Sequence, residues 1–117
     1  MAMTSMTEAT LEIVSRRFRT LGEPFRLRLL QQLEQGECTV GELVDSLEAS
    51  QSNVSKHLQL LYDAGLVARR RDGNSIVYSI GDPIVFELCR LVCRSEAAKS
   101  KRDLQELTRP LGRKASR

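Results

Sequence analysis

The chain has 117 residues, no tryptophan and an aromatic fraction of only 4%. Proteins that bind single-stranded nucleic acid stack successive bases on aromatic rings, so this composition disfavours that class. The chain has a single histidine, which cannot furnish an imidazole-rich metal site. It also lacks a nucleophile–base constellation and a glycine loop that could cradle a phosphate. We therefore expect a protein that is not an enzyme.

Long apolar runs and an export signal are also missing. No stretch approaches the roughly 20 apolar residues that a membrane-spanning helix needs, and nothing resembles a signal peptide. The chain has three cysteines, Cys38, Cys89 and Cys93. This odd number and their spacing do not match a framework of disulfide bonds. These features predict reduced thiols, a cytoplasmic location and no membrane partner.

Charge is present but unevenly spread along the chain. The net charge is +3, with 18 Lys and Arg against 15 Asp and Glu. Residues 1–63 are net acidic, whereas residues 64–117 hold twice as many basic as acidic side chains. A basic second half in a chain long enough for one small domain favours a polyanionic partner.

The stretch from Thr39 to Gly65 predicts two short helices joined by a tight turn at residues 48–50. Thr39 is the expected N-cap of the first helix, and Glu42 completes a capping box. Ser50 is the expected N-cap of the second helix. That helix shows an apolar stripe at helical spacing, formed by Val54, Leu58 and Leu61.

The other face of the second helix carries small donors and acceptors plus one cation. In a helix-turn-helix the second helix enters the major groove with its N-terminal residues foremost. Such side chains suit base edges and phosphates, although a solvated helix face would look similar. The predicted DNA contacts here are Gln51, Ser52, Asn53, Ser55, Lys56 and Gln59.

A basic hairpin is predicted directly after this unit. LVARRR and SIVYSI read as strands, and Asp72-Gly73 between them is a strong hairpin signal. We expect the arginines at the hairpin tip, so that the tip lies along phosphates or enters a minor groove. A helix-turn-helix followed by such a hairpin is a winged helix. The predicted contacts here are Arg69, Arg70, Arg71 and Asn74.

Two helices precede this unit and one follows it. We expect a helix ending near Leu21 and capped by Thr7 or Thr10, then a helix from Pro24 to Gly36. Arg26 and Arg28 should point outward from this second helix.

The last helix should begin at Asp82-Pro83 and extend to about Leu107, and its first turns are apolar nearly all round. A second copy is the expected cover. A two-fold homodimer would place its recognition helices about 34 Å apart on a palindromic operator in double-stranded DNA.

The expected organisation has three parts. Residues 1–9 form a flexible N-terminus, and residues 10–96 form a DNA-binding and dimerisation domain. Residues 97–117 form a basic extension that is partly disordered, above all beyond Pro110.

The chain resembles the ArsR/SmtB family of dimeric bacterial repressors over roughly residues 11–93. Four strings carry the resemblance: LGEPFRLRLLQQL, GECTVGELVDSL, SQSNVSKHLQLLYDAGLV and RRRDGNSIVYSI. It implies a mainly α fold with a two-stranded β-wing, dimerised through the first and last helices. It also implies a repressor that an inducer releases from its operator. The implied recognition helix is Gln51–Asp63 and the implied wing is Arg69–Ser75, with His57 in a structural role.

The resemblance does not supply the inducer. Many soft-metal sensors of the family carry Cys-Val-Cys-Asp-Leu before the recognition helix, where this chain has Thr39-Val40-Gly41-Glu42-Leu43. Both thiolate positions are lost, so the soft-metal site is absent as usually built. The zinc or nickel sites of other members use Asp and His of the last helix, which here contains Asp82 but no His.

The three cysteines leave three alternatives. Cys89 and Cys93 lie four residues apart and share a helix face, so with Cys38 they could bind arsenite or another soft ion. They could instead undergo oxidation or take up reactive sulfur. They could also be small apolar interface residues, with no cofactor at all. A winged helix used for protein contact is the alternative from a different functional class.

Overall fold

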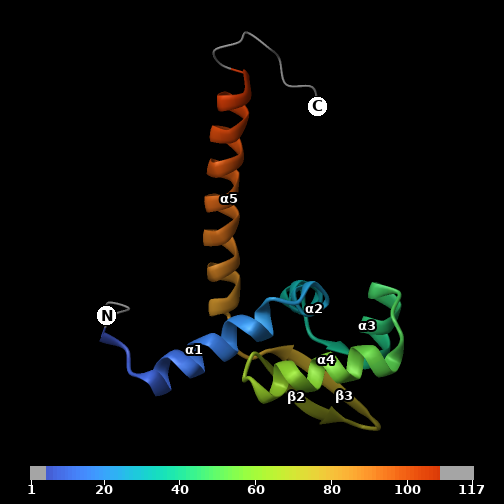
Figure 1. Cartoon of the computed structure of the whole chain (residues 1–117). Coiled ribbons are helices and arrows are strands. Elements are labelled where there is room, and N and C mark those ends of the chain that lie inside the picture. The colour runs from blue at the N-terminus through green and yellow to red at the C-terminus, as the bar shows by residue number, and fades with distance from the viewer. Residues whose placement is uncertain (1–4, 109–117) are drawn as a thin grey trace. The chain divides into compact units, whose positions relative to one another are not determined.

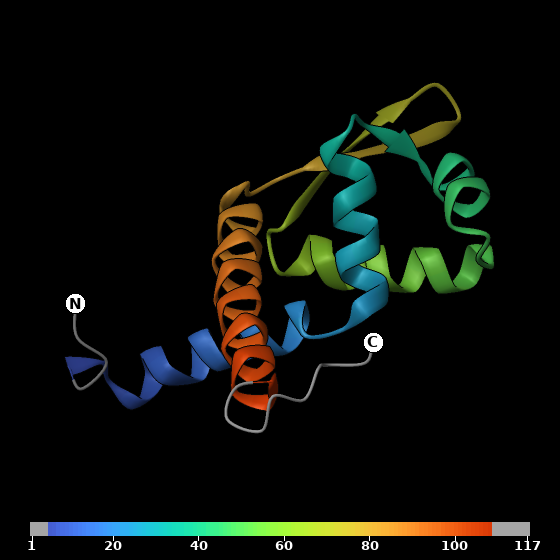
Figure 2. The same ribbon diagram turned by 90° about the horizontal axis from the view of Figure 1, so that it is seen from above.

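The computed structural model of the protein describes residues 5–108, and the chain divides between Asp82 and Pro83 into two compact units (Figures 1 and 2). Within residues 5–82, the first unit holds four helices and three strands. Within residues 83–108, the second unit is one long helix, α5, from Ile84 to Thr108. The elements of the first unit are α1 (Glu8–Leu21), α2 (Pro24–Glu34), β1 (Cys38–Thr39), α3 (Val40–Leu47), α4 (Gln51–Asp63), β2 (Val67–Asp72) and β3 (Ser75–Ile80).

Side-chain caps set where the first two helices begin. The Thr7 side chain accepts a hydrogen bond from the Thr10 backbone N–H and caps α1. The Glu23 carboxylate caps α2 by accepting from the Arg26 backbone N–H, and Pro24 occupies the first helical position. The predicted bounds of both helices are confirmed to within two residues.

The three strands form one antiparallel sheet in the order β1-β3-β2. The predicted hairpin is confirmed, with Gly73 in the left-handed region at φ 65°. Its turn is Gly73-Asn74, because Asp72 still pairs with Ser75. The two-residue strand β1 was not predicted, since so short a segment leaves no alternation in the sequence.

The core of the first unit is built from leucine and valine. Burying such a side chain is worth roughly 1.5–3 kcal/mol, so the apolar stripe of α4 decides which face of that helix turns inward. Side chains of three helices and of the connection between α4 and β2 are fully buried: Leu29, Leu30, Leu43, Val54, Leu58, Leu61 and Leu66.

The prediction that Arg26 points outward is wrong. Its Nε donates to His57 Nδ1 at 3.1 Å, and its Nη1 donates to the Thr20 carbonyl at 3.0 Å. The end of α1 leaves carbonyl groups without a helical partner, and the long Arg26 side chain can reach one of them. Arg28 is exposed, as predicted.

Helix α5 extends to Thr108, one residue beyond its predicted end. Leu91 and Val92 on it are 50% and 60% exposed. The expected disordered tail beyond Pro110 and residues 1–4 of the expected flexible N-terminus lie outside the described residues. Between residues 5 and 108, no helix combines the length and the hydropathy needed to cross a membrane.

Candidate nucleic-acid interface

Helices α3 and α4 are joined by the sharp turn that the sequence predicts. Thr39 Oγ1 accepts a hydrogen bond from the Glu42 backbone N–H at 3.2 Å, and Glu42 Oε1 accepts one from the Thr39 backbone N–H at 2.9 Å. Glu48 adopts the left-handed conformation at φ 52° and ends α3. Ser50 Oγ then accepts from the Asn53 N–H at 3.2 Å and starts α4. These local contacts set the geometry of a helix-turn-helix.

Helix α4 has one buried and one exposed face. Val54, Leu58 and Leu61 are 0% exposed. Asn53 is half-buried, so it is the least accessible of the six predicted DNA contacts. The other five share one exposed surface on the opposite face: Gln51, Ser52, Ser55, Lys56 and Gln59.

The predicted wing contacts are exposed, but the arginines do not lie at its tip. Arg69, Arg70 and Arg71 lie within β2, where they pair with Tyr78, Val77 and Ile76 of β3. The tip itself carries Asn74. Successive strand residues point to opposite faces, so Arg69 and Arg71 share one face and Arg70 lies on the other.

Arg69 ties the wing to α4. Its Nη1 donates to Gln59 Oε1 at 3.0 Å, and its guanidinium lies 3.7 Å from the centroid of the Tyr62 ring. Hydrogen bonding to Tyr78 and contact with Tyr62 raise the pKa of Arg69. Gln59 Nε2 in turn donates to Asp63 Oδ1 at 2.8 Å.

Gln59 and Arg69 were predicted as separate DNA contacts, and Tyr62 was not predicted to contact either of them. Gln59 and Tyr62 are three residues apart on one helix, so their side chains are neighbours. This spacing is the sequence feature that could have indicated a role for Tyr62. Two predicted DNA contacts thus hold each other in the free protein.

Arg70 is paired on the other face of the wing. Its Nη2 lies 2.8 Å from Glu37 Oε2, just before β1, and both side chains are about half exposed. An exposed ion pair contributes at most about 1 kcal/mol, so a DNA phosphate can replace the carboxylate. No local pattern could reveal this partner, because the pair spans 33 positions.

His57 lies on the inward side of α4 and is only 8% exposed. Its Nδ1 accepts from Arg26, and its ring centroid lies 5.2 Å from that of Phe25. Burial lowers the pKa of His57, the nearby charges of Arg26 and Lys56 lower it further, and Glu23 acts in the opposite direction. An acceptor nitrogen requires the neutral ring, so the contact and the charge state agree.

We expect acidification to destabilise the protein through His57. The folded state holds this pKa below the ordinary value of 6.5, so the unfolded chain binds more protons in that range. The stabilising contribution is complete above pH 6.5 and declines as the pH falls toward the folded pKa. The melting temperature should therefore fall between pH 7.5 and 5.5. His57→Gln, which keeps an acceptor for Arg26, should flatten this dependence, and equal slopes would contradict the assignment.

The cysteines differ in environment. Cys38, in β1, is half-buried, and its Sγ donates to the Gly36 carbonyl at 3.5 Å. Burial raises the pKa of Cys38 and the Glu42 carboxylate raises it further, so little reactive thiolate forms there. On α5, Cys89 is half-buried and Cys93 is exposed. Within residues 5–108 of one copy, no group of three His, Cys, Asp or Glu side chains could hold a metal ion.

Comparison with known proteins agrees with this geometry. The family model described as "Bacterial regulatory protein, arsR family" matches residues 23–69. A probable mercury resistance operon repressor from Streptomyces lividans is 46% identical over 80 residues, which are 68% of this chain and 64% of that protein. The match therefore spans less than two thirds of that repressor.

The match covers a larger share of the chain in two solved structures. The crystal structure of M. tuberculosis Rv0081 is 38% identical, with a TM-score of 0.70 over 83% of this chain and 97% of that one. A homodimeric winged helix-turn-helix DNA-binding domain from Mycobacterium bovis, described as a possible ArsR-family regulator, is 31% identical. Its TM-score is 0.68, and the match covers 83% of this chain and 91% of that one.

Proposed function

Because this chain belongs to the ArsR family of bacterial regulatory proteins, we propose that it is a cytoplasmic transcriptional repressor that binds a palindromic operator as a homodimer. The observation that carries the proposal is the exposed polar surface on α4, beside a wing that exposes three consecutive arginines. This surface supplies base-reading groups next to phosphate-binding ones, as a DNA-binding protein requires.

Each group has a distinct role in the proposed complex. Gln51, Ser52 and Ser55 lie on the leading turns of α4 and would read base edges in the major groove. Lys56 and the wing arginines would bind phosphates. Gln59 and Arg69 would act together, because they are hydrogen-bonded in the free protein. The remaining proposed contacts are Asn53, Arg70, Arg71 and Asn74.

Exposed apolar side chains support the proposed dimer through α1 and α5. On α1, Phe18 is 58% exposed. On α5, Leu91 and Val92 are 50% and 60% exposed. Large apolar side chains at this exposure are typical of interaction surfaces when several lie together on a helix.

The salt dependence of DNA binding tests the proposal. We expect affinity for a duplex from the gene's upstream region to fall steeply with salt, because phosphate binding releases counterions. Arg70→Ala should weaken binding to all sequences and reduce the slope of log K against log salt by about 1. Fluorescence anisotropy measures both quantities.

Matched variants sharpen this test. Arg28→Ala removes an exposed arginine of α2 and should leave the slope unchanged. Glu37→Gln removes the competing carboxylate of Arg70 and should strengthen binding slightly. A shallow salt dependence would instead favour a winged helix that contacts proteins, and an unchanged slope in Arg70→Ala would remove Arg70 from the interface.

We further propose that the inducer acts through the thiols of α5. Cys89 and Cys93 lie one helical turn apart, and Cys93 is exposed, whereas the raised pKa of the half-buried Cys38 disfavours its reactive thiolate. Binding of arsenite or another soft ion is the second candidate, supported by a relative named as a mercury resistance operon repressor. Three thiolates would then have to come together, with Cys38 contributed by either copy.

A further inference from the structure

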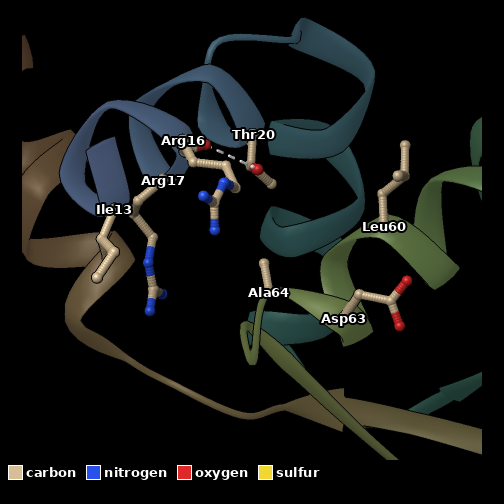
Figure 3. Close-up of a pocket in the computed structure, with 7 residues that line it drawn as sticks. All are labelled: Ile13, Arg16, Arg17, Thr20, Leu60, Asp63 and Ala64. Atoms are coloured by element: carbon tan, nitrogen blue, oxygen red, sulfur yellow. Dashed lines mark hydrogen bonds between the residues drawn. The ribbon is translucent and has the colours of Figure 1, made fainter. Parts of the chain in front are cut away.

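Helices α1 and α4 of the first unit border a pocket that the proposed DNA interface does not use. Its volume is about 400 Å³. Four residues of α1 line one side, and the C-terminal end of α4 lines the other (Figure 3). The lining residues are Ile13, Arg16, Arg17, Thr20, Leu60, Asp63 and Ala64.

The positive charge of this pocket is only partly balanced within the described part of the chain. Arg16 offers its backbone carbonyl to the Thr20 hydroxyl, but its guanidinium has no hydrogen bond or ion pair among residues 5–108. Arg17 Nη1 forms an ion pair with Asp82 Oδ2 at 3.8 Å, but this distance is too long for a hydrogen bond. The buried Nη1 therefore has no hydrogen-bond acceptor among the described residues.

The acidic residue of the lining does not neutralise these arginines. The Asp63 carboxylate accepts from Gln59 at 2.8 Å, and Figure 3 shows it turned away from both guanidinium groups. A buried N–H of a charged group without an acceptor is costly, so an anion that enters here gains a bond that the empty pocket lacks.

The remaining lining is apolar and incompletely covered. Ile13 is 60% exposed and Leu60 is 40% exposed, and Ala64 lies between the two helices at the end of α4. A pocket with two guanidinium groups and apolar walls suits a molecule that carries both an anionic group and an apolar body. A bare inorganic anion would leave the apolar walls unused.

We propose that this pocket binds a small organic acid, with its carboxylate between Arg16 and Arg17 and its apolar body against Ile13 and Ala64. One wall is α4, whose Gln59 contacts both Asp63 and Arg69, so the occupant acts on the DNA-binding surface. This regulatory role rests on the proposed function, whereas binding itself does not. Binding at this pocket would regulate DNA affinity independently of the cysteines.

Benzoate is the probe for binding, measured by ¹⁵N NMR on the whole protein without DNA. We expect saturable shifts confined to residues 13–20 and 60–64, with a dissociation constant in the millimolar range. Benzamide has the same ring without the charge and should bind at least tenfold more weakly. Arg17→Gln and Arg16→Gln should each weaken benzoate binding about tenfold. Arg19→Gln is the matched control, because Arg19 lies on the same helix, bonds to Ser15 and does not line the pocket.

Several results would overturn the proposal. Equal binding of benzoate and benzamide would remove the role of charge, and equal loss in Arg19→Gln would make the attraction unspecific. An absence of shifts, together with a change of oligomeric state in Arg17→Gln, would make the pocket an interface between copies. Saturating benzoate should also lower operator affinity in anisotropy at constant ionic strength, with chloride as the control anion. Binding without that effect overturns the regulatory role and leaves the proposed DNA binding untouched.

Discussion

Gln51→Ala is expected to lower affinity for the cognate operator by roughly 5- to 150-fold while leaving binding to unrelated DNA nearly unchanged. Gln51 is exposed on the first turn of α4, the part of a recognition helix that reaches base edges. One well-formed side-chain contact to a base is worth about 1–3 kcal/mol of discrimination, which corresponds to that range. The ratio of specific to non-specific affinity, measured by anisotropy at one salt concentration, is the decisive quantity.

Gln31→Ala is the matched control, because Gln31 is an exposed glutamine on α2 outside the proposed interface. It should leave the ratio unchanged. Ser52→Ala should act like Gln51→Ala, with a smaller loss. If Gln51→Ala weakens operator and unrelated DNA equally, then Gln51 binds a phosphate, and base reading must lie further along α4.

A thiol-directed inducer should release the reduced protein from its operator with at least a tenfold loss of affinity. Each reagent tests one chemistry, namely oxidised glutathione or tetrasulfide for the sulfur route and arsenite for the soft-ion route. In the sulfur route, the Cys93 thiolate attacks a disulfide, forms a mixed disulfide and displaces a thiol. The new group would lie on α5, the proposed dimerisation helix, beside the exposed Leu91 and Val92.

Single Cys→Ser variants separate the chemistries. Cys93→Ser should abolish release by oxidised glutathione, and Cys38→Ser should leave it intact, because Cys38 is half-buried with a raised pKa. Loss of the arsenite response in each of the three variants would indicate a trithiolate site shared between copies. Operator binding that no reagent changes would make the cysteines packing residues.

The contact between Arg69 and Gln59 changes how the wing is understood. The arginines of a wing are expected to be independent phosphate ligands, but here Arg69 lies on the Tyr62 ring and bonds to α4. It therefore positions the wing relative to the recognition helix as well as offering charge to DNA. Arg70, on the opposite face, is the more independent phosphate ligand, because only an exposed carboxylate holds it.

Local sequence signals were sufficient for most of the fold. The starts of α3 and α4 are predictable from Thr39, Glu42 and Ser50, because their side chains hydrogen-bond to backbone groups at most three residues away. Gly73 indicates the hairpin turn because glycine adopts a positive φ without steric cost. The exposed face of α4 follows from its apolar stripe, since 0% exposure of Val54, Leu58 and Leu61 leaves the polar residues outside.

The sequence by itself thus determined the helices, the hairpin and the polar surface of α4, because short-range hydrogen bonds and hydrophobic periodicity specify them. Only the tertiary structure decided the partners of the charged side chains. Arg26 turns inward to His57, Arg70 pairs with Glu37, and Arg16 and Arg17 meet the end of α4 at a pocket. Long side chains can reach partners in many directions, and the packing of distant segments selects among them.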